Sequence, residues 1–162
     1  PKLPRLNKRL VGHLQTNKTR KAVELFDSID SVDSLKLARR LSEISKEKKT
    51  ILEVLLQVNT ANDPTKHGLK KDEIDTFLEI MELESLDVRG LMTIGELTLD
   101  KSTTRKTFRT LRRLMDQLNG GLRNEKKLSE LSMGMSGDFE IAVEEGATMV
   151  RLGTALFGIR DQ

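Results

Sequence analysis

Glycine and serine are concentrated in the segment 131–138, LSMGMSGD, which lies between a predicted strand and a predicted helix. Glycine has no Cβ atom, so backbone N–H groups in such a turn can converge on one ligand. The helix that follows adds its free N–H groups and the positive end of its dipole. These features predict a cradle for a phosphate group. Because a carboxylate there would compete with an anion, we expect Asp138 to cap the helix and point aside.

A second turn of this kind follows the next predicted strand, in the segment 149–154, MVRLGT. It offers the cation of Arg151, close backbone approach at Gly153 and the hydroxyl of Thr154. In (β/α) barrels, phosphate sites are often built from the loops after the last two strands. We therefore expect the two turns to converge on one anionic group. The alternative interpretation is that both glycine-bearing turns serve only tight packing.

Two further candidates lie at the ends of earlier predicted strands. His13 is interpreted as a hydrogen-bonded structural residue, and neither a second histidine nor an acid at a suitable spacing predicts a metal pair with it. Lys66 and His67 lie in a turn-rich loop after the most apolar strand, where functional residues of barrels gather. Lys66 could meet an anionic ligand or form a Schiff base, and otherwise it is a solvated loop lysine.

Methionines recur at the ends of predicted strands, at Met92, Met133 and Met135. Their polarizable side chains could form a wall against a flat ring. Simple core packing is the preferred interpretation of all three.

The elements that position these residues alternate along the chain. Short apolar runs predict strands at 9–14, 28–32, 51–58, 87–92, 127–133 and 148–152. Between them, helical spacing groups Leu37, Leu41 and Ile44, then Ile74, Phe77, Leu78 and Met81, then Leu111, Leu114, Met115 and Leu118, and finally Phe139, Ala142 and Val143. Asp33 or Ser34 is suited to cap the first of these helices, and glycines follow the last two. About six strand–helix repeats predict an α/β protein with a parallel sheet, either doubly wound or a (β/α) barrel.

Basic residues line the outer side of the helix predicted around residues 105–118. They are Arg105, Lys106, Arg109, Arg112 and Arg113. A solvated helix face is the preferred interpretation, and a patch for a partner or an anionic ligand is the alternative.

Composition excludes several functional classes. The net charge of +3 in 162 residues is too small to imply a nucleic-acid or membrane surface, and 3% aromatic residues give little material for base stacking. Cysteine is absent, which rules out disulfides, thiolate zinc sites and a cysteine nucleophile. No apolar run approaches the ~20 residues that span a bilayer. We expect a single cytoplasmic domain over residues 1–162, monomeric or weakly dimeric, with no nucleic-acid or membrane partner.

Several segments, in order along the chain, resemble one family. They are 12–18 (GHLQTNK), 31–34 (SVDS), 57–59 (QVN), 66–68 (KHG), 90–92 (GLM), 131–138 (LSMGMSGD), 150–154 (VRLGT) and 157–158 (FG). The chain resembles the pyridoxal phosphate homeostasis proteins, also called the YggS or PROSC family. The resemblance implies a (β/α)8 barrel of the alanine racemase N-terminal type. It also implies a protein that binds pyridoxal 5′-phosphate (PLP), buffers and distributes it in vitamin B6 metabolism, and is not an enzyme.

The resemblance also implies roles for individual residues. Ser136, Gly137, Gly153 and Thr154 would hold the phosphate of PLP, and Arg151 would lie near either the ring nitrogen or the phosphate. Met92 and Ser132 would lie near the cofactor, and Lys66 matches a lysine of the family's loop after the Gln-Val-Asn strand. PLP-dependent enzymes that receive the cofactor are the implied partners.

The chain departs from the family pattern at its start. Family members have two further strand–helix units at the N-terminus, and the lysine that links PLP lies on the first of them. No residue in 1–8 matches that lysine's motif, so we expect an incomplete barrel of about six units with two open sheet edges. Two alternative functions remain, a PLP-dependent racemase-like enzyme and a barrel that binds phosphate esters without PLP. Tyrosine, a common second base in such racemases, is absent.

Overall fold

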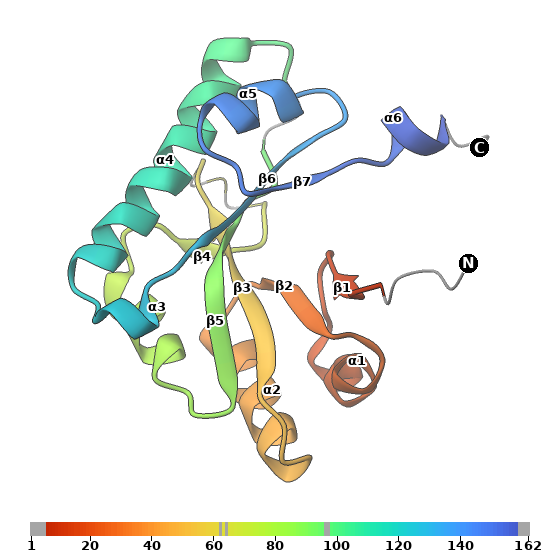
Figure 1. The fold of residues 1–162 in the computed structure, drawn as a ribbon, viewed down its shortest axis with the longest axis vertical. Helices are drawn as coiled ribbons and strands as arrows, with labels where there is room; N and C mark the ends of the chain where they lie inside the picture. Colours follow the sequence, from red (N-terminus) through yellow and green to blue (C-terminus); the bar gives the residue numbers. More distant parts are fainter. Residues whose placement is uncertain (1–5, 62, 64, 96–97, 159–162) are drawn as a thin grey trace.

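A computed structural model describes residues 6–61, 63, 65–95 and 98–158 of the chain. Seven parallel strands form one sheet in the order β1-β2-β3-β5-β6-β7, with β4 paired to β3 beside this path (Figure 1). The strands are β1 (Arg9–Leu10), β2 (Ser28–Val32), β3 (Leu52–Asn59), β4 (Leu69–Lys70), β5 (Leu86–Met92), β6 (Glu130–Met135) and β7 (Met149–Arg151). The helices are η1 (Thr16–Lys18), α1 (Thr19–Leu25), α2 (Leu35–Glu47), α3 (Ile74–Met81), α4 (Lys101–Gly120), η2 (Asn124–Lys126), α5 (Phe139–Glu144) and α6 (Thr154–Phe157).

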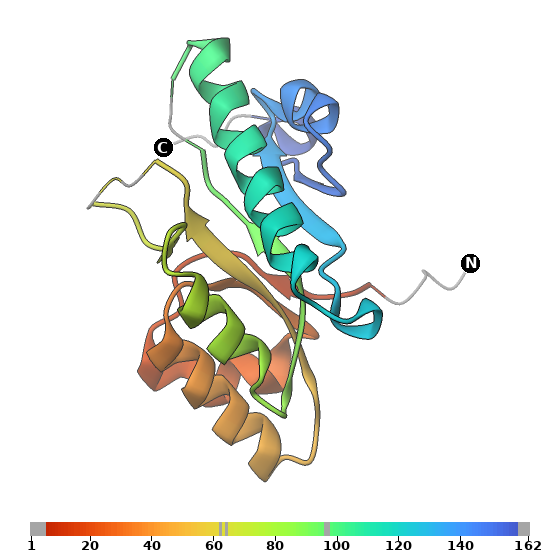
Figure 2. The same ribbon diagram turned by 90° about the vertical axis from the view of Figure 1, so that its left-hand side faces the viewer.

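Each strand of the main path is followed by an α-helix, which gives six β/α units. Figure 2 shows α2, α3 and α4 in front of the sheet, so these helices cover one face of it. The edges of the sheet are β1 and β7. This is the expected incomplete barrel of about six units. Among the described residues, no helix is both long and apolar enough to cross a membrane.

The core between sheet and helices follows the predicted apolar spacing. Leu37, Leu41 and Ile44 of α2 are fully or almost fully buried against the sheet. Leu78 of α3 and Val143 of α5 are exposed, so their assignment to the apolar faces was wrong. Both helices are short, and only the residues nearest the sheet, such as Phe77 and Ala142, are covered.

Local hydrogen bonds confirm the predicted helix ends. The Ser34 hydroxyl accepts the Leu37 N–H at 3.3 Å and caps α2. Asp100, which the sequence analysis did not single out, caps α4 by accepting the N–H groups of Ser102 and Thr103. Gly121 ends α4, where the glycine pair predicted an end.

The first strand is shorter than predicted. β1 covers only Arg9–Leu10, because the backbone at Gly12 has a φ of 143° and leaves the sheet. Ser31 of β2 donates its hydroxyl to the Gly12 carbonyl at 2.6 Å and fixes this departure. The apolar pattern of 9–14 therefore continues into a loop that carries His13.

Charged residues of four strands meet around Arg9. Its guanidinium lies 2.9 Å from Asp30, 2.7 Å from Glu53 and 3.2 Å from Glu130. Burial acts to lower the pKa of Arg9, but the hydrogen bond and charge of Asp30, helped by the two glutamates, outweigh it and raise that pKa. The cluster links β1 to β2, β3 and β6.

Candidate functional site

The turns after β6 and β7 lie side by side. The hydroxyl oxygen of Ser136 accepts the backbone N–H of Gly153 at 3.3 Å and that of Ala155 at 3.1 Å. An open cavity of about 730 Å³ lies here, lined by Val11, Met135, Ser136, Gly137, Arg151, Leu152, Gly153 and Thr154. The two turns meet as expected and bring together five of the eight predicted site residues, whose binding of an anionic group stays a prediction.

The glycines of the first turn have two different functions. Gly134 has a φ of 93°, and a Cβ added to it would lie 2.5 Å from the Ala142 side chain, so it allows α5 to pack on β6. A Cβ added to Gly137 or Gly153 would meet nothing within 4 Å. The backbone of both residues therefore faces open space, where a ligand can approach it closely.

Arg151 is held by Ser132 of β6 and by Thr93, which directly follows β5. It donates one hydrogen bond to the buried Ser132 hydroxyl at 2.9 Å and another to the Thr93 carbonyl at 2.8 Å. Burial lowers the pKa of Arg151, while the charges of Asp138 and Asp30 act in the opposite direction. Ser132 thus contacts Arg151, which itself lines the cavity.

The Asp138 side chain does not cap α5, which corrects the expectation from the sequence. Its Oδ1 accepts the Met135 N–H at 2.6 Å and closes the turn before the helix, and no side-chain cap bond forms at α5. The three-residue spacing of Met135 and Asp138 brings the carboxylate back to the strand end. The carboxylate is absent from the cavity lining, as expected.

Two predicted site residues lie apart from this cavity. Met92 of β5 is fully buried, in line with core packing. Lys66 lies in the loop between β3 and β4, where it lines a separate cavity with His13 and His67. Their predicted places beside the cofactor stay predictions.

The basic face of α4 is largely paired. Arg105 and Arg109 each bind the buried carboxylate of Glu145 at 2.9 Å, and Arg112 donates to the Glu145 carbonyl at 3.2 Å. These three arginine side chains remain partly exposed, as a solvated face predicts, but the structure adds a shared partner, Glu145, which follows α5 and packs against α4. Lys106 and Arg113 are exposed, as predicted.

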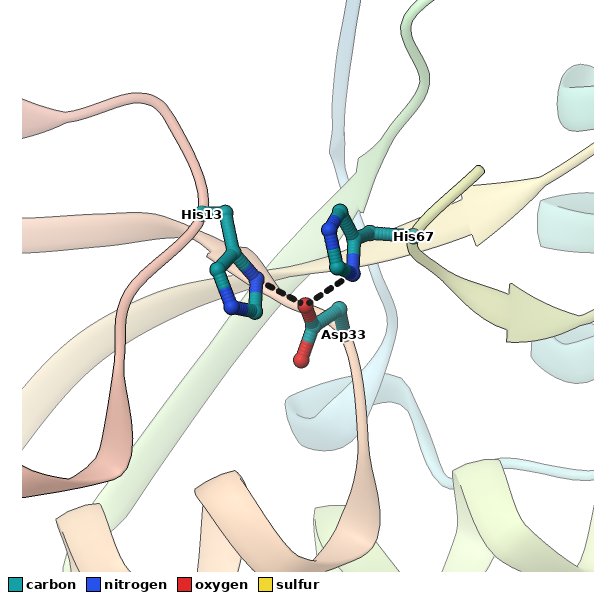
Figure 3. Close-up of side chains that lie close together, drawn as sticks. All are labelled: His13, Asp33 and His67. Carbon is teal, nitrogen blue, oxygen red and sulfur yellow. Dashed lines mark hydrogen bonds and ion pairs between the residues drawn. The ribbon is translucent and has the colours of Figure 1, made fainter. Parts of the chain in front are cut away.

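The structure brings together two histidines and an aspartate that the local sequence patterns did not group. The rings of His13 and His67 stack with centroids 3.9 Å apart, and both point to the Asp33 carboxylate (Figure 3). The hydrogen bond between His13 and Asp33 confirms the interpretation of His13 as a hydrogen-bonded residue, whereas the expectation that no second histidine or acid accompanies it was wrong. The three residues follow β1, β2 and β3, and their common place after consecutive parallel strands was the signal available in the sequence.

Comparison with known proteins agrees with this architecture. Residues 7–161 match the family described as alanine racemase, N-terminal domain. The pyridoxal phosphate homeostasis proteins of Pseudomonas aeruginosa and Synechocystis are 44% and 42% identical to the chain over 157 and 156 residues, or 96% of it in both cases. These alignments cover 66% and 71% of the two relatives.

The chain belongs to the pyridoxal phosphate homeostasis protein family.

Solved structures of relatives share the fold of this family member. PipY of Synechococcus elongatus without PLP superimposes with a TM-score of 0.89 at 43% identity, covering 96% of the chain and 73% of PipY. PipY with PLP bound gives a TM-score of 0.86 at 41% identity, covering 96% of the chain and 72% of PipY. Alanine racemase of Clostridium difficile, at 20% identity and a TM-score of 0.81, shares the fold over 98% of the chain and 43% of the racemase.

The chain is shorter than its curated relatives. It spans 66% of the Pseudomonas aeruginosa protein and 63% of the Vibrio cholerae protein. The chain therefore corresponds to about two thirds of these relatives.

Proposed function

We propose that residues 1–162 form a PLP-binding domain that carries and buffers PLP in the cytoplasm without catalysing a reaction. The observation that carries this proposal is the meeting of the two turns through Ser136. The names of the relatives and the PLP-bound PipY structure support PLP as the ligand. PLP-dependent enzymes are the proposed recipients of the cofactor.

The donors around the cavity fit a phosphate group. Ser136 and Thr154 offer hydroxyls, and Gly137 and Gly153 offer backbone that no side chain covers. Arg151 adds a positive charge on the same side, with its guanidinium oriented by Ser132 and the Thr93 carbonyl. Charge-assisted hydrogen bonds of this kind are about twice as strong as neutral ones. No carboxylate lies among the described residues that line the cavity, although the charges of Asp138 and Asp30 act on Arg151.

Bound PLP supplies an aldehyde that reacts reversibly with amines and a ring that withdraws electrons. The chain's own residues hold and orient the group. Catalysis of racemase type would need a side chain that exchanges protons beside the ring. The described residues that line the cavity include no histidine, lysine or acid, and the chain has no tyrosine. This lining supports a carrier over an enzyme.

Equilibrium dialysis of the chain against PLP tests the proposal, with inorganic phosphate as competitor. Saturable binding that phosphate displaces is the expected result. Equal affinity for PLP and for unrelated phosphate monoesters would favour a general phosphate-ester binder. Absence of PLP binding, or binding that phosphate leaves unchanged, would show that the two turns do not hold the cofactor. Turnover of amino acids by the PLP-loaded chain would refute the proposal that the domain does not catalyse a reaction.

A further inference from the structure

Three potential metal ligands from three loops meet at the ends of β1, β2 and β3. His13 Nδ1 lies 2.9 Å from Asp33 Oδ2, and His67 Nδ1 lies 3.7 Å from the same oxygen (Figure 3). One ligand atom from each residue lies within 4.8 Å of the other two. The imidazole rings stack at an interplanar angle of 16°, so both nitrogens face the carboxylate from one side.

The Asp33 carboxylate is fixed by its surroundings. It follows β2 directly, and its side chain is only 8% exposed. The Ser34 hydroxyl, which caps α2, lies 3.2 Å from Asp33 Oδ1 and donates to it. The second oxygen, Oδ2, is left to face the two histidines. Such hydrogen bonds to a ligating carboxylate are typical of metal sites.

Each histidine is anchored through its backbone. The Ser31 hydroxyl binds the carbonyl of Gly12, next to His13. The Gln57 amide donates to the His67 carbonyl at 3.1 Å. Gly68, with a φ of 134°, allows the chain to turn there, because a Cβ would lie 2.6 Å from the backbone nitrogen of Asn59. Three separate loops are thus held in register by buried or partly buried strand residues.

The spacing of the ligand atoms fits a zinc-like ion, although the His13–Asp33 contact is also a hydrogen bond. Zinc binds histidine nitrogen and carboxylate oxygen at about 2.0–2.2 Å, which places tetrahedral ligand atoms roughly 3.3 Å apart. The two contacts to Asp33 Oδ2, at 2.9 and 3.7 Å, lie on either side of this value. The longer contact is not a hydrogen bond, so the carboxylate does not satisfy His67 by itself.

We infer that His13, Asp33 and His67 form a binding site for a divalent transition metal of the zinc class. Two imidazoles select such ions over Mg²⁺ and Ca²⁺, which prefer oxygen ligands. Three protein ligands leave a coordination position for water or for an external ligand. A cavity of about 250 Å³, lined by both histidines, Asn59 and Lys66, adjoins the cluster and offers room for it.

This site lies apart from the cavity between the β6 and β7 turns, although Lys66, which was predicted to lie near the cofactor, lines the cavity beside the histidines. No described residue lines both the cavity beside the histidines and the cavity between the β6 and β7 turns. Variants of either histidine are therefore expected to leave the cavity between the β6 and β7 turns unchanged.

Because of the chain's composition, zinc binding by imidazole groups can be assigned to particular residues. The chain has no cysteine and only these two histidines, so any imidazole that binds metal belongs to the cluster. We expect one equivalent of Zn²⁺ to bind in competition with a chromophoric chelator. His13→Gln and His67→Gln should each weaken binding at least about tenfold, since even changes beside a ligand cost 10–100-fold. Both side chains are about half exposed, so the fold should persist, as circular dichroism would show.

One further variant tests the third ligand, and another serves as a control. Asp33→Asn retains shape and hydrogen-bonding capacity but removes the charge, and it should weaken zinc binding to a similar extent. Glu84→Gln removes a highly exposed carboxylate at the opposite ends of the strands and should change nothing. Absence of stoichiometric binding would overturn the inference. So would zinc affinity that the histidine variants do not alter, or that Glu84→Gln lowers equally.

Discussion

The hydroxyl oxygen of Ser136, after β6, accepts the backbone N–H of Gly153, after β7, at 3.3 Å. The two residues are 17 positions apart in the sequence, and both α5 and β7 lie between them. The bond holds the two turns together at one end of the sheet. It also places a hydroxyl next to the uncovered backbone and the Arg151 guanidinium of the same cavity.

Replacement of both Ser136 and Arg151 by alanine is expected to weaken PLP binding by well over tenfold. Each charge-assisted hydrogen bond to the phosphate contributes about 1.5–3 kcal/mol. Equilibrium dialysis measures the effect, and the exposed Arg113→Ala is the control, since it removes a charge outside the cavity. Unchanged affinity in the double variant would place the phosphate elsewhere.

Gly134→Ala is expected to destabilise the chain by about 1–3 kcal/mol, because of the overlap with Ala142 and the left-handed backbone. Gly137→Ala is the matched control, since its Cβ would point into open space. Urea denaturation gives both free energies of unfolding. Equal stability of the two variants would contradict the packing function assigned to Gly134.

Glu145→Gln is expected to lower the melting temperature by about 2–6 °C, given that 1 kcal/mol corresponds to about 2–4 °C in a chain of this size. Hydrogen bonds from Arg109 and Arg105 lower the pKa of Glu145, so its ionised form stabilises the folded state. That stabilisation is fully present above the pKa that the Glu145 carboxyl has in the unfolded chain. It is lost as the pH falls through the lower pKa that the carboxyl has in the folded chain.

Thermal melts across this acidic range should show a weaker pH dependence for Glu145→Gln than for the wild type. The exposed Glu144→Gln is the control, because Glu144 pairs with Arg105 alone among the described residues. A larger effect from Glu144 than from Glu145 would refute the central position of Glu145.

The ionised cap of α4 should persist to a lower pH than an ordinary aspartate would allow. Hydrogen bonds from Thr103 and Ser102 lower the pKa of Asp100 from 3.8 to about 2. The contribution of the ionised cap to stability is therefore complete above pH 3.8 and is lost between 3.8 and about 2. NMR titration of the Asp100 carboxyl carbon measures the pKa directly. A midpoint at the ordinary aspartate value would show that the cap bonds do not form in solution.

The structure confirms most of what local sequence patterns predicted. Apolar periodicity located the main strands and helices, and residue types at helix ends located the Ser34 cap and the Gly121 stop. These signals are local, since a period of two or of 3.6 residues reports which side chains share one face of one element. The same patterns misassigned Leu78 and Val143, because the width of a covered face depends on the packing partner.

The sequence by itself determined the β/α order, the glycine–serine turns and the family, because each of these follows from short motifs of neighbouring residues. Tertiary structure alone decided that Glu145 binds three arginines, that Ser132 orients Arg151 and that His13 stacks on His67. In a parallel sheet, helices separate successive strands, so groups at adjacent strand ends are far apart in the chain. Only the register and curvature of the sheet bring such groups into contact.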